Sequence, residues 1–372
     1  REPKGGLGRL VAIGGVPLGL GFVLAYLPPL APGWWGMAGV FAGHIAFRTA
    51  YAFINVPYLA MSARVSADSN DRAFVAGMRM LSGTLAAVAV ALGTVPLGGL
   101  LLGTKAAANA YLGAALLFAV AGAVILAWVG ATYREADLPE RRAPVPVWAA
   151  LKSLAANRAF VTLNLAMIAV IVAVTILNKS VLYYFKYFLD DEGGGQLALA
   201  SMSVVSAVSV PLWMLLQRRL GTRALWFLAA AGAMTGLALF AAFDIHRAGV
   251  MQAYLMVMQA MIVGLNFVFW AMLPNTIEYG EQRTGPRVEA ALFGMAALLQ
   301  RVAIGIATAV LGFGFDAAGY VANVEQSAAT LNAMRLTIAL VPLGFLALSC
   351  VLMAMNPLGR GAHARIVKGL RG

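Results

Sequence analysis

Two charged segments of the chain carry side chains that can form ion pairs. The first runs from Asn55 to Arg72 and the second from Pro274 to Glu289, and each follows a long apolar run. In both, a proline ends the apolar run, a short polar loop follows, and an arginine-bearing apolar run begins. We predict that their charges form a network that acts as a gate, built from Asp68, Asp71, Arg72, Glu278, Glu281, Arg287 and Glu289.

Polar residues inside apolar runs form a second group of candidates. His44, Arg48, Tyr51 and Asn55 are spaced four, three and four apart, which places them on one stripe of a helix. A charge near the middle of a bilayer costs at least ~2.5–3.5 kcal/mol, so Arg48 requires a partner, water or a ligand. The stripe therefore predicts a binding face, although the same residues are also able to hold neighbouring helices together by hydrogen bonds.

Arg301 is the other deep charge, 13 residues into the run 288–315. No Asp or Glu lies deep in any apolar run, so Arg301 is expected to face water, an anionic substrate or an acid outside this sequence. Its planar fork suits carboxylates. Three further positions complete the predicted substrate site: Arg79, Asn266 and Trp270. The indole of Trp270 is suited to stack on a sugar ring.

Composition explains what must position these residues. Of the 372 residues 61% are hydrophobic and 11% charged, far from the roughly 25% charged of a soluble domain. A membrane-spanning helix needs about 20 apolar residues. Ten runs meet this length, at 9–29, 35–61, 74–102, 109–133, 159–189, 197–217, 224–244, 250–274, 288–315 and 331–356. They lack the alternation of barrel strands, so we predict an all-α membrane protein with ten transmembrane helices.

Basic residues orient these helices. The ends and connections on one side carry 19 Lys and Arg, whereas those on the other carry only Lys105 and Arg247. The positive-inside rule then places both ends of the chain in the cytoplasm. We predict a multi-pass protein of a bacterial-type inner membrane. We predict an N-terminal bundle at 1–133, a cytoplasmic linker at 134–158, and a C-terminal six-helix bundle with a tail at 159–372.

The two charged segments resemble the signature regions of the glycoside-pentoside-hexuronide:cation symporters, the melibiose-permease branch of the major facilitator superfamily. The run Ile277-Glu278-Tyr279-Gly280-Glu281 with Thr284-Gly285-x-Arg287 is the more specific match. Gly8-Arg9 resembles the basic loop before the family's third helix. The resemblance implies a major facilitator-type bundle in which family helices 3 to 12 are present and the first two are missing.

The same resemblance assigns roles to individual residues. Tyr51 and Asn55 match an aromatic and a polar or acidic position of the family's sugar pocket, and Asn55 stands where melibiose permease has an aspartate. Arg79 matches a family arginine, and Arg301 matches a lysine of the central cavity. An asparagine in place of the acid removes a charge that is useful for binding sodium, which favours protons as the coupling ion.

Paired Pro-interrupted segments in two halves of a hydrophobic chain indicate a repeat-built secondary transporter. The predicted function is therefore cation-coupled symport of a sugar, glycoside or sugar acid by alternating access. One alternative is a carrier of a lysolipid-like or amphipathic anion, and another is a membrane scaffold or sensor without transport.

Other classes of protein are disfavoured. The three histidines are far apart and the single cysteine lies in the last run, so no metal site is expected. No GxxxxGK[ST] loop occurs and the basic residues are dispersed, so we expect no enzyme, no cofactor apart from the coupling H+ or Na+, and no nucleic acid. The expected partners are a small-molecule substrate and membrane lipid, with the protein a monomer.

Overall fold

The computed structural model describes residues 6–29, 32–103, 107–134, 145–322, 324–359 and 361–371. Within these ranges the regular structure is entirely helical, with no strand. Ten of the helices in the described ranges are long and apolar enough to cross a membrane, which agrees with the ten spans predicted from sequence. The chain divides into two compact units, one of Arg1–Ala67 with Ser82–Arg141, the other of Asp68–Leu81 with Arg142–Gly372.

The first unit contains α1 (Gly6–Tyr26), α2 (Trp34–Arg64), the later part of α3 (Ser69–Leu102) and α4 (Ala107–Thr132). Helix α1 packs against both α2 and α4. At Gly8 of α1 and Gly130 of α4 the backbones approach so closely that a Cβ on either residue would collide with the other's carbonyl oxygen. Small residues permit this close packing where lipid supplies no hydrophobic drive between helices.

The second unit contains the beginning of α3 and nine further helices. These are α5 (Val147–Ala156), α6 (Arg158–Tyr187), α7 (Glu192–Leu220), α8 (Thr222–Ala242), α9 (Ala248–Met272), α10 (Asn275–Thr284), α11 (Glu289–Ala317), α12 (Ala328–Ala354) and α13 (Ala362–Arg371).

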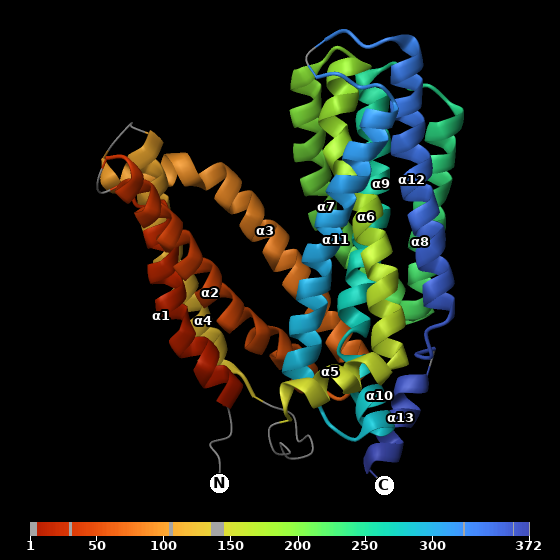
Figure 1. Ribbon diagram of the computed structural model, residues 1–372. Coiled ribbons are helices and arrows are strands. Elements are labelled where there is room, and N and C mark those ends of the chain that lie inside the picture. The colour runs from red at the N-terminus through yellow and green to blue at the C-terminus, as the bar shows by residue number, and fades with distance from the viewer. Residues whose placement is uncertain are drawn as a thin grey trace. The chain divides into compact units, whose positions relative to one another are not determined.

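Helix α6 is the core of this unit, because it packs against α7, α9, α11 and α12 (Figure 1). Most residues in the apolar stretch of α6 are buried, whereas few of those in α2 of the first unit are. Large apolar side chains are instead exposed along the outer helices, as expected of surfaces that meet lipid.

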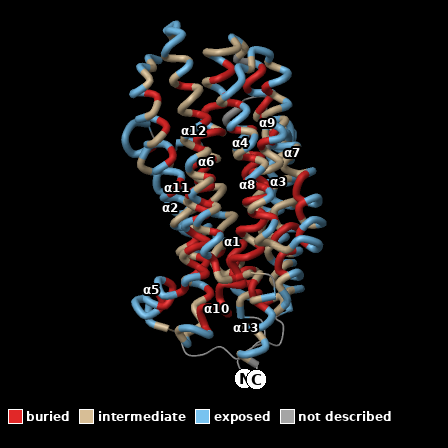
Figure 2. The backbone as a smooth tube through the Cα atoms, turned by 90° about the vertical axis from the view of Figure 1, so that its right-hand side faces the viewer, coloured by how far each residue is buried: buried red, intermediate tan, exposed pale blue. Residues whose placement is uncertain are grey.

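Three short helices lie where the sequence suggested loops or a tail. The segment after Pro274 was expected to be a polar loop, but α10 forms there with Glu278 in its first turn, where a carboxylate is favoured. Helix α13 forms in the predicted tail, and α5 lies inside the region predicted as a linker. Buried residues run along α10, which packs against α5 and α13 (Figure 2).

Pro57 also differs from expectation. It was expected to end its apolar run, yet it lies inside α2, which continues to Arg64. A proline within a membrane helix is tolerated when the freed carbonyl finds other partners. The two compact units do not follow the order of the chain, because Asp68–Leu81 groups with the second unit. The predicted division into bundles at 1–133 and 159–372 with a linker between them stays a prediction.

Candidate functional site

Arg72 forms the centre of a buried charge network in the second unit. It lies in the first turns of α3, and its side chain is fully buried. Its guanidinium grips Glu278 of α10 with two bonds, Nη2 to Oε1 at 2.7 Å and Nη1 to Oε2 at 2.9 Å. Nη1 also donates to Asn275 Oδ1 at 3.3 Å and to the Pro274 carbonyl at 3.4 Å. Such a pair of parallel charge-assisted hydrogen bonds is among the strong contacts that proteins make.

Arg287 joins the remaining acids of the second segment to this pair. Its Nη1 donates to Glu281 Oε2 at 2.9 Å and its Nε donates to Glu289 Oε1 at 2.6 Å. Its Nη2 also donates to Glu278 Oε1 at 3.4 Å, so the two arginines share one carboxylate. Burial alone would lower the pKa of Arg287, but the charges of Glu289 and Glu278 raise it above its usual value.

The same contacts set the ionisation of Glu278. Burial would raise the pKa of this carboxyl, but hydrogen bonds from Arg72 and His363 and the charges of Arg72 and Arg287 outweigh burial. They hold the pKa of Glu278 well below its ordinary range. Glu278 is therefore ionised at neutral pH, as a gate that depends on charge pairs requires.

His363 is a member of this network that sequence reasoning missed. It lies on α13, is buried, and places Nε2 at 3.3 Å from Glu278 Oε2. His363 falls in the predicted C-terminal tail, where the structure has α13. Helix α13 packs directly on α10, and this contact brings the two residues together.

The seven predicted gate residues are brought together unequally. Arg72, Glu278, Glu281, Arg287 and Glu289 form one network. Asp68 instead caps the start of α3, where its Oδ1 accepts from the backbone amides of Asn70 at 2.7 Å and Asp71 at 3.3 Å. Asp71 is exposed in the first turn of that helix. The role of the seven as a gate stays a prediction.

Two predicted substrate residues meet in the second unit. The guanidinium of Arg79, on α3, lies 4.2 Å from the centroid of the Trp270 ring, on α9. This is a cation-π contact, and both side chains are half-buried. Asn266 lies one turn before Trp270 on the same helix and is also half-buried. Arg79 and Trp270 therefore place a cation against an indole face, and Asn266 adds an amide one turn away on α9.

Arg301 is exposed near the middle of α11, and it makes no hydrogen bond or ion pair with any residue that the structure describes. In the first unit, the predicted stripe lies on α2. Arg48 and Tyr51 are exposed and Asn55 is half-buried. The Tyr51 ring lies 6.4 Å from that of Phe47.

The described part of the chain has ten membrane-length helices, three of them with an arginine near the middle, as is typical of a helical transporter. Comparison with known proteins supports this class. The chain belongs to the MFS/sugar transport protein family, which it matches over residues 5–360. This match confirms the predicted major facilitator resemblance and shows a multi-pass membrane protein of a transporter family, not an enzyme.

Several curated proteins are similar along most of the chain. The Glucuronide carrier protein homolog of Escherichia coli is 25% identical over 83% of this chain and 67% of its own length. The Isoprimeverose transporter of Lactiplantibacillus pentosus is 24% identical over 90% and 71%. The Putative sulfoquinovose importer of Salmonella typhimurium is 26% identical over 82% and 65%. These similarities support sugar transport.

A solved structure shares the fold. The crystal structure of the major facilitator transporter FucP in the outward conformation matches with a TM-score of 0.70 over 95% of this chain and 84% of that chain. The sequence identity is 14%, so this similarity establishes the fold alone.

Proposed function

We propose that the protein is a secondary active transporter that carries a sugar, glycoside or sugar acid in symport with a cation, the proton rather than sodium. The observation that carries the proposal is the set of arginines at membrane depth in a chain of this family. Arg48, Arg79 and Arg301 lie near the middle of candidate spans, whereas every acid in those spans lies at an end. Two similar proteins are named for acidic sugars, which supports the same substrate class.

The contact between Arg79 and Trp270 supports a sugar ligand. An indole face offers an apolar surface for a sugar ring, and a guanidinium donates to hydroxyl or carboxylate oxygens. Asn266 adds an amide one turn away. A substrate with both a ring and an acidic group would use all three kinds of contact.

Asn55 supports coupling to protons. Sodium is a hard cation that favours carboxylate oxygens, and Asn55 offers only a neutral amide where the related permease has an acid. We further propose that both ends of the chain are cytoplasmic, by the distribution of Lys and Arg, and that the protein acts as a monomer without a bound cofactor.

Uptake into proteoliposomes tests the proposal. A labelled glucuronide and a neutral glycoside are compared under an inward proton gradient, with the Arg301→Ala variant as a control. We expect saturable uptake that a protonophore abolishes and that Arg301→Ala lacks. A many-fold stimulation by sodium at fixed pH and potential would contradict proton coupling. The absence of saturable uptake of either sugar would favour a scaffold or sensor.

A further inference from the structure

Helix α5 presents large apolar side chains that are mostly exposed. Val147 and Trp148, at its beginning, are 77% and 79% exposed. Trp148, Lys152 and Ala155 are spaced four and three apart and are all exposed, so they form one outer stripe of the helix. The buried residues that pack the helix against the second unit lie on its other side: Ala150, Ser153 and Leu154.

Helix α5 lies at the level where two membrane-length helices begin. Only Asn157 separates it from α6, and the Oδ1 atom of this residue caps α6 by accepting from the Phe160 amide at 2.9 Å. Helix α5 also packs against α11, and Figure 1 shows it crossing the ends of α6 and α11. A span begins where the hydrocarbon core meets the headgroups, so the outer stripe lies at the level of the headgroups.

The sequence around the outer stripe is basic. Between Arg141 and Arg158 there are four basic residues and no Asp or Glu. Of these four, Lys152 and Arg158 are exposed. A cluster of this size directly beside the cytoplasmic end of a span is attracted to anionic headgroups, and Trp is enriched at the same interface. The outer stripe therefore combines an interfacial ring with a positive charge.

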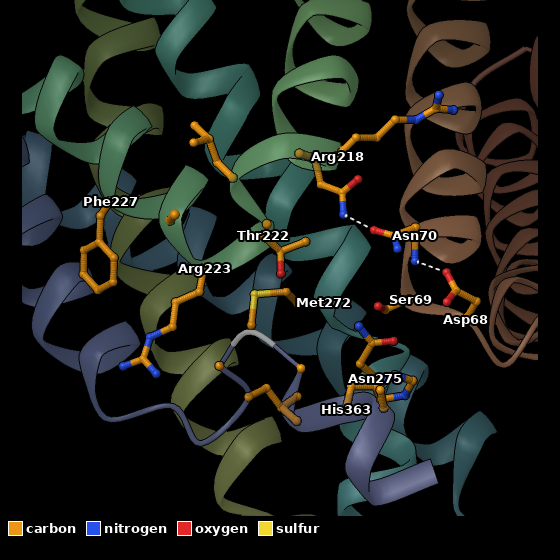
Figure 3. Close-up of a pocket in the computed structure, with 18 residues that line it drawn as sticks. Asp68, Ser69, Asn70, Arg218, Thr222, Arg223, Phe227, Met272, Asn275 and His363 are labelled. Atoms are coloured by element: carbon orange, nitrogen blue, oxygen red, sulfur yellow. Dashed lines mark hydrogen bonds between the residues drawn. The ribbon is translucent and has the colours of Figure 1, made fainter. Parts of the chain in front are cut away.

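This end of the second unit carries further basic side chains. Arg218, at the end of α7, and Arg223, at the start of α8, border a hollow of about 680 Å³. Figure 3 shows both side chains directed away from that hollow. Arg218, Arg219 and Arg283 are exposed. The second unit thus carries exposed positive charge around the end that bears the outer stripe.

We propose that the outer stripe of α5 is covered by anionic phospholipids of the cytoplasmic leaflet. Trp148 and its neighbour Val147 lie against the acyl carbons nearest the headgroups, and the Lys152 ammonium pairs with a lipid phosphate. An interfacial helix of this kind buries its apolar side about 5–10 Å into the boundary between headgroups and acyl chains. The choice of leaflet rests on the cytoplasmic placement of the chain ends proposed above.

The same helix also holds the helix that carries Glu278. Ser153 Oγ lies 2.7 Å from Thr284 Oγ1 of α10. Asn157 Nδ2, at the end of α5, donates to the Thr276 carbonyl of α10 at 2.7 Å. Lipid that covers the outer side of α5 therefore supports, from beneath the membrane surface, the element on which the charge network is built.

Fluorescence quenching by lipids tests this proposal. Ala155→Cys and Ala149→Cys, each in a Cys350→Ser background, are labelled with bimane. Both alanines are exposed, but only Ala155 lies on the outer stripe. In nanodiscs whose lipids carry a nitroxide near the headgroup, we expect stronger lipid quenching at position 155 and stronger quenching by aqueous iodide at position 149. Trp148→Cys, on the same stripe, takes the place of Ala155→Cys if that variant does not fold.

The charge is tested by comparing nitroxide-labelled phosphatidylglycerol with nitroxide-labelled phosphatidylcholine at equal mole fraction. Lys152→Gln is expected to reduce the preference for phosphatidylglycerol at position 155 about fivefold, as the loss of one lysine near the surface predicts. Lys368→Gln is the matched control, because Lys368 is an exposed lysine on α13, and it is expected to leave this preference unchanged.

Equal lipid quenching at positions 155 and 149, or the same preference for phosphatidylglycerol in both lysine variants, overturns the proposal. A label at position 155 that neither lipid nor iodide quenches assigns the outer stripe to a protein contact, within the chain or with a second copy, and overturns it as well. The assay contains no sugar and measures no uptake, so none of these outcomes bears on the proposed transport.

Discussion

Substituting Arg72, and so breaking its contact with Glu278, is expected to destabilise the second unit strongly. In Arg72→Met the carboxylate keeps His363 at 3.3 Å and Arg287 at 3.4 Å, but it loses two bonds of 2.7 and 2.9 Å. Breaking a buried ion pair by removing one partner costs about 3–5 kcal/mol. At roughly 2–4 °C per kcal/mol, this cost lowers Tm by about 6 °C at the low end and by no more than about 20 °C.

The assay is thermal unfolding in a neutral detergent, followed by tryptophan fluorescence. Arg283→Met is the matched control, because Arg283 lies on α10 but is exposed. Its guanidinium lies 5.7 Å from the centroid of the Tyr279 ring, so its loss is expected to change stability by no more than about 1 kcal/mol. The double variant Arg72→Met/Glu278→Gln is expected to lose less than the sum of the single variants, by about 1–3 kcal/mol. Equal effects of Arg72→Met and Arg283→Met, or strict additivity, would refute the reasoning.

Three further outcomes follow from the described contacts. Arg301→Ala is expected to abolish substrate binding while Tm stays within about 1 °C, because no described residue pairs with it; Arg301→Lys keeps partial binding of a neutral sugar but loses most binding of a carboxylate, as equilibrium titrations will show. Arg79→Gln removes a cation-π contact with Trp270 and is expected to cost about 0.5–2 kcal/mol in Tm-derived stability, whereas no change would contradict that contact. Since the pKa of Glu278 is held below its ordinary value of 4.5, the stabilisation is complete above that pH and is lost as pH falls further; Tm measured from pH 7 to 3.5 is expected to fall less steeply in Glu278→Gln than in the wild-type protein.

The apolar runs predicted the membrane helices well, because one helix must satisfy its own backbone in lipid and its length follows from bilayer thickness. Short polar helices escape this reasoning. Helix α10 has few apolar residues, and it forms where Pro274 begins a turn and α5, α9 and α13 pack around it. Its helical state therefore depends on tertiary contacts that no local pattern contains.

The charge network could be predicted only in part. The arginines and acids of the two segments stood out because charges are rare in this chain, and five of them do meet. His363 was not predicted, since 85 positions separate it from Glu278 and only the packing of α13 joins them. The contact of Arg79 with Trp270 was equally hidden, because helical spacing relates residues of one helix and not residues of two.

Helix α3 belongs to both units, and this shared membership has a mechanical consequence. Its residues up to Leu81 group with the second unit, and from Ser82 they group with the first. Ser82-Gly83 therefore stands at the boundary, and Gly-Ser pairs are among the places where helices bend most readily. A Cβ at Gly83 would meet nothing within 4 Å, so the absent side chain is not explained by crowding. Gly83→Ala would fit without strain and would make α3 stiffer at this point. A single methyl group therefore controls how easily the helix bends between its two parts.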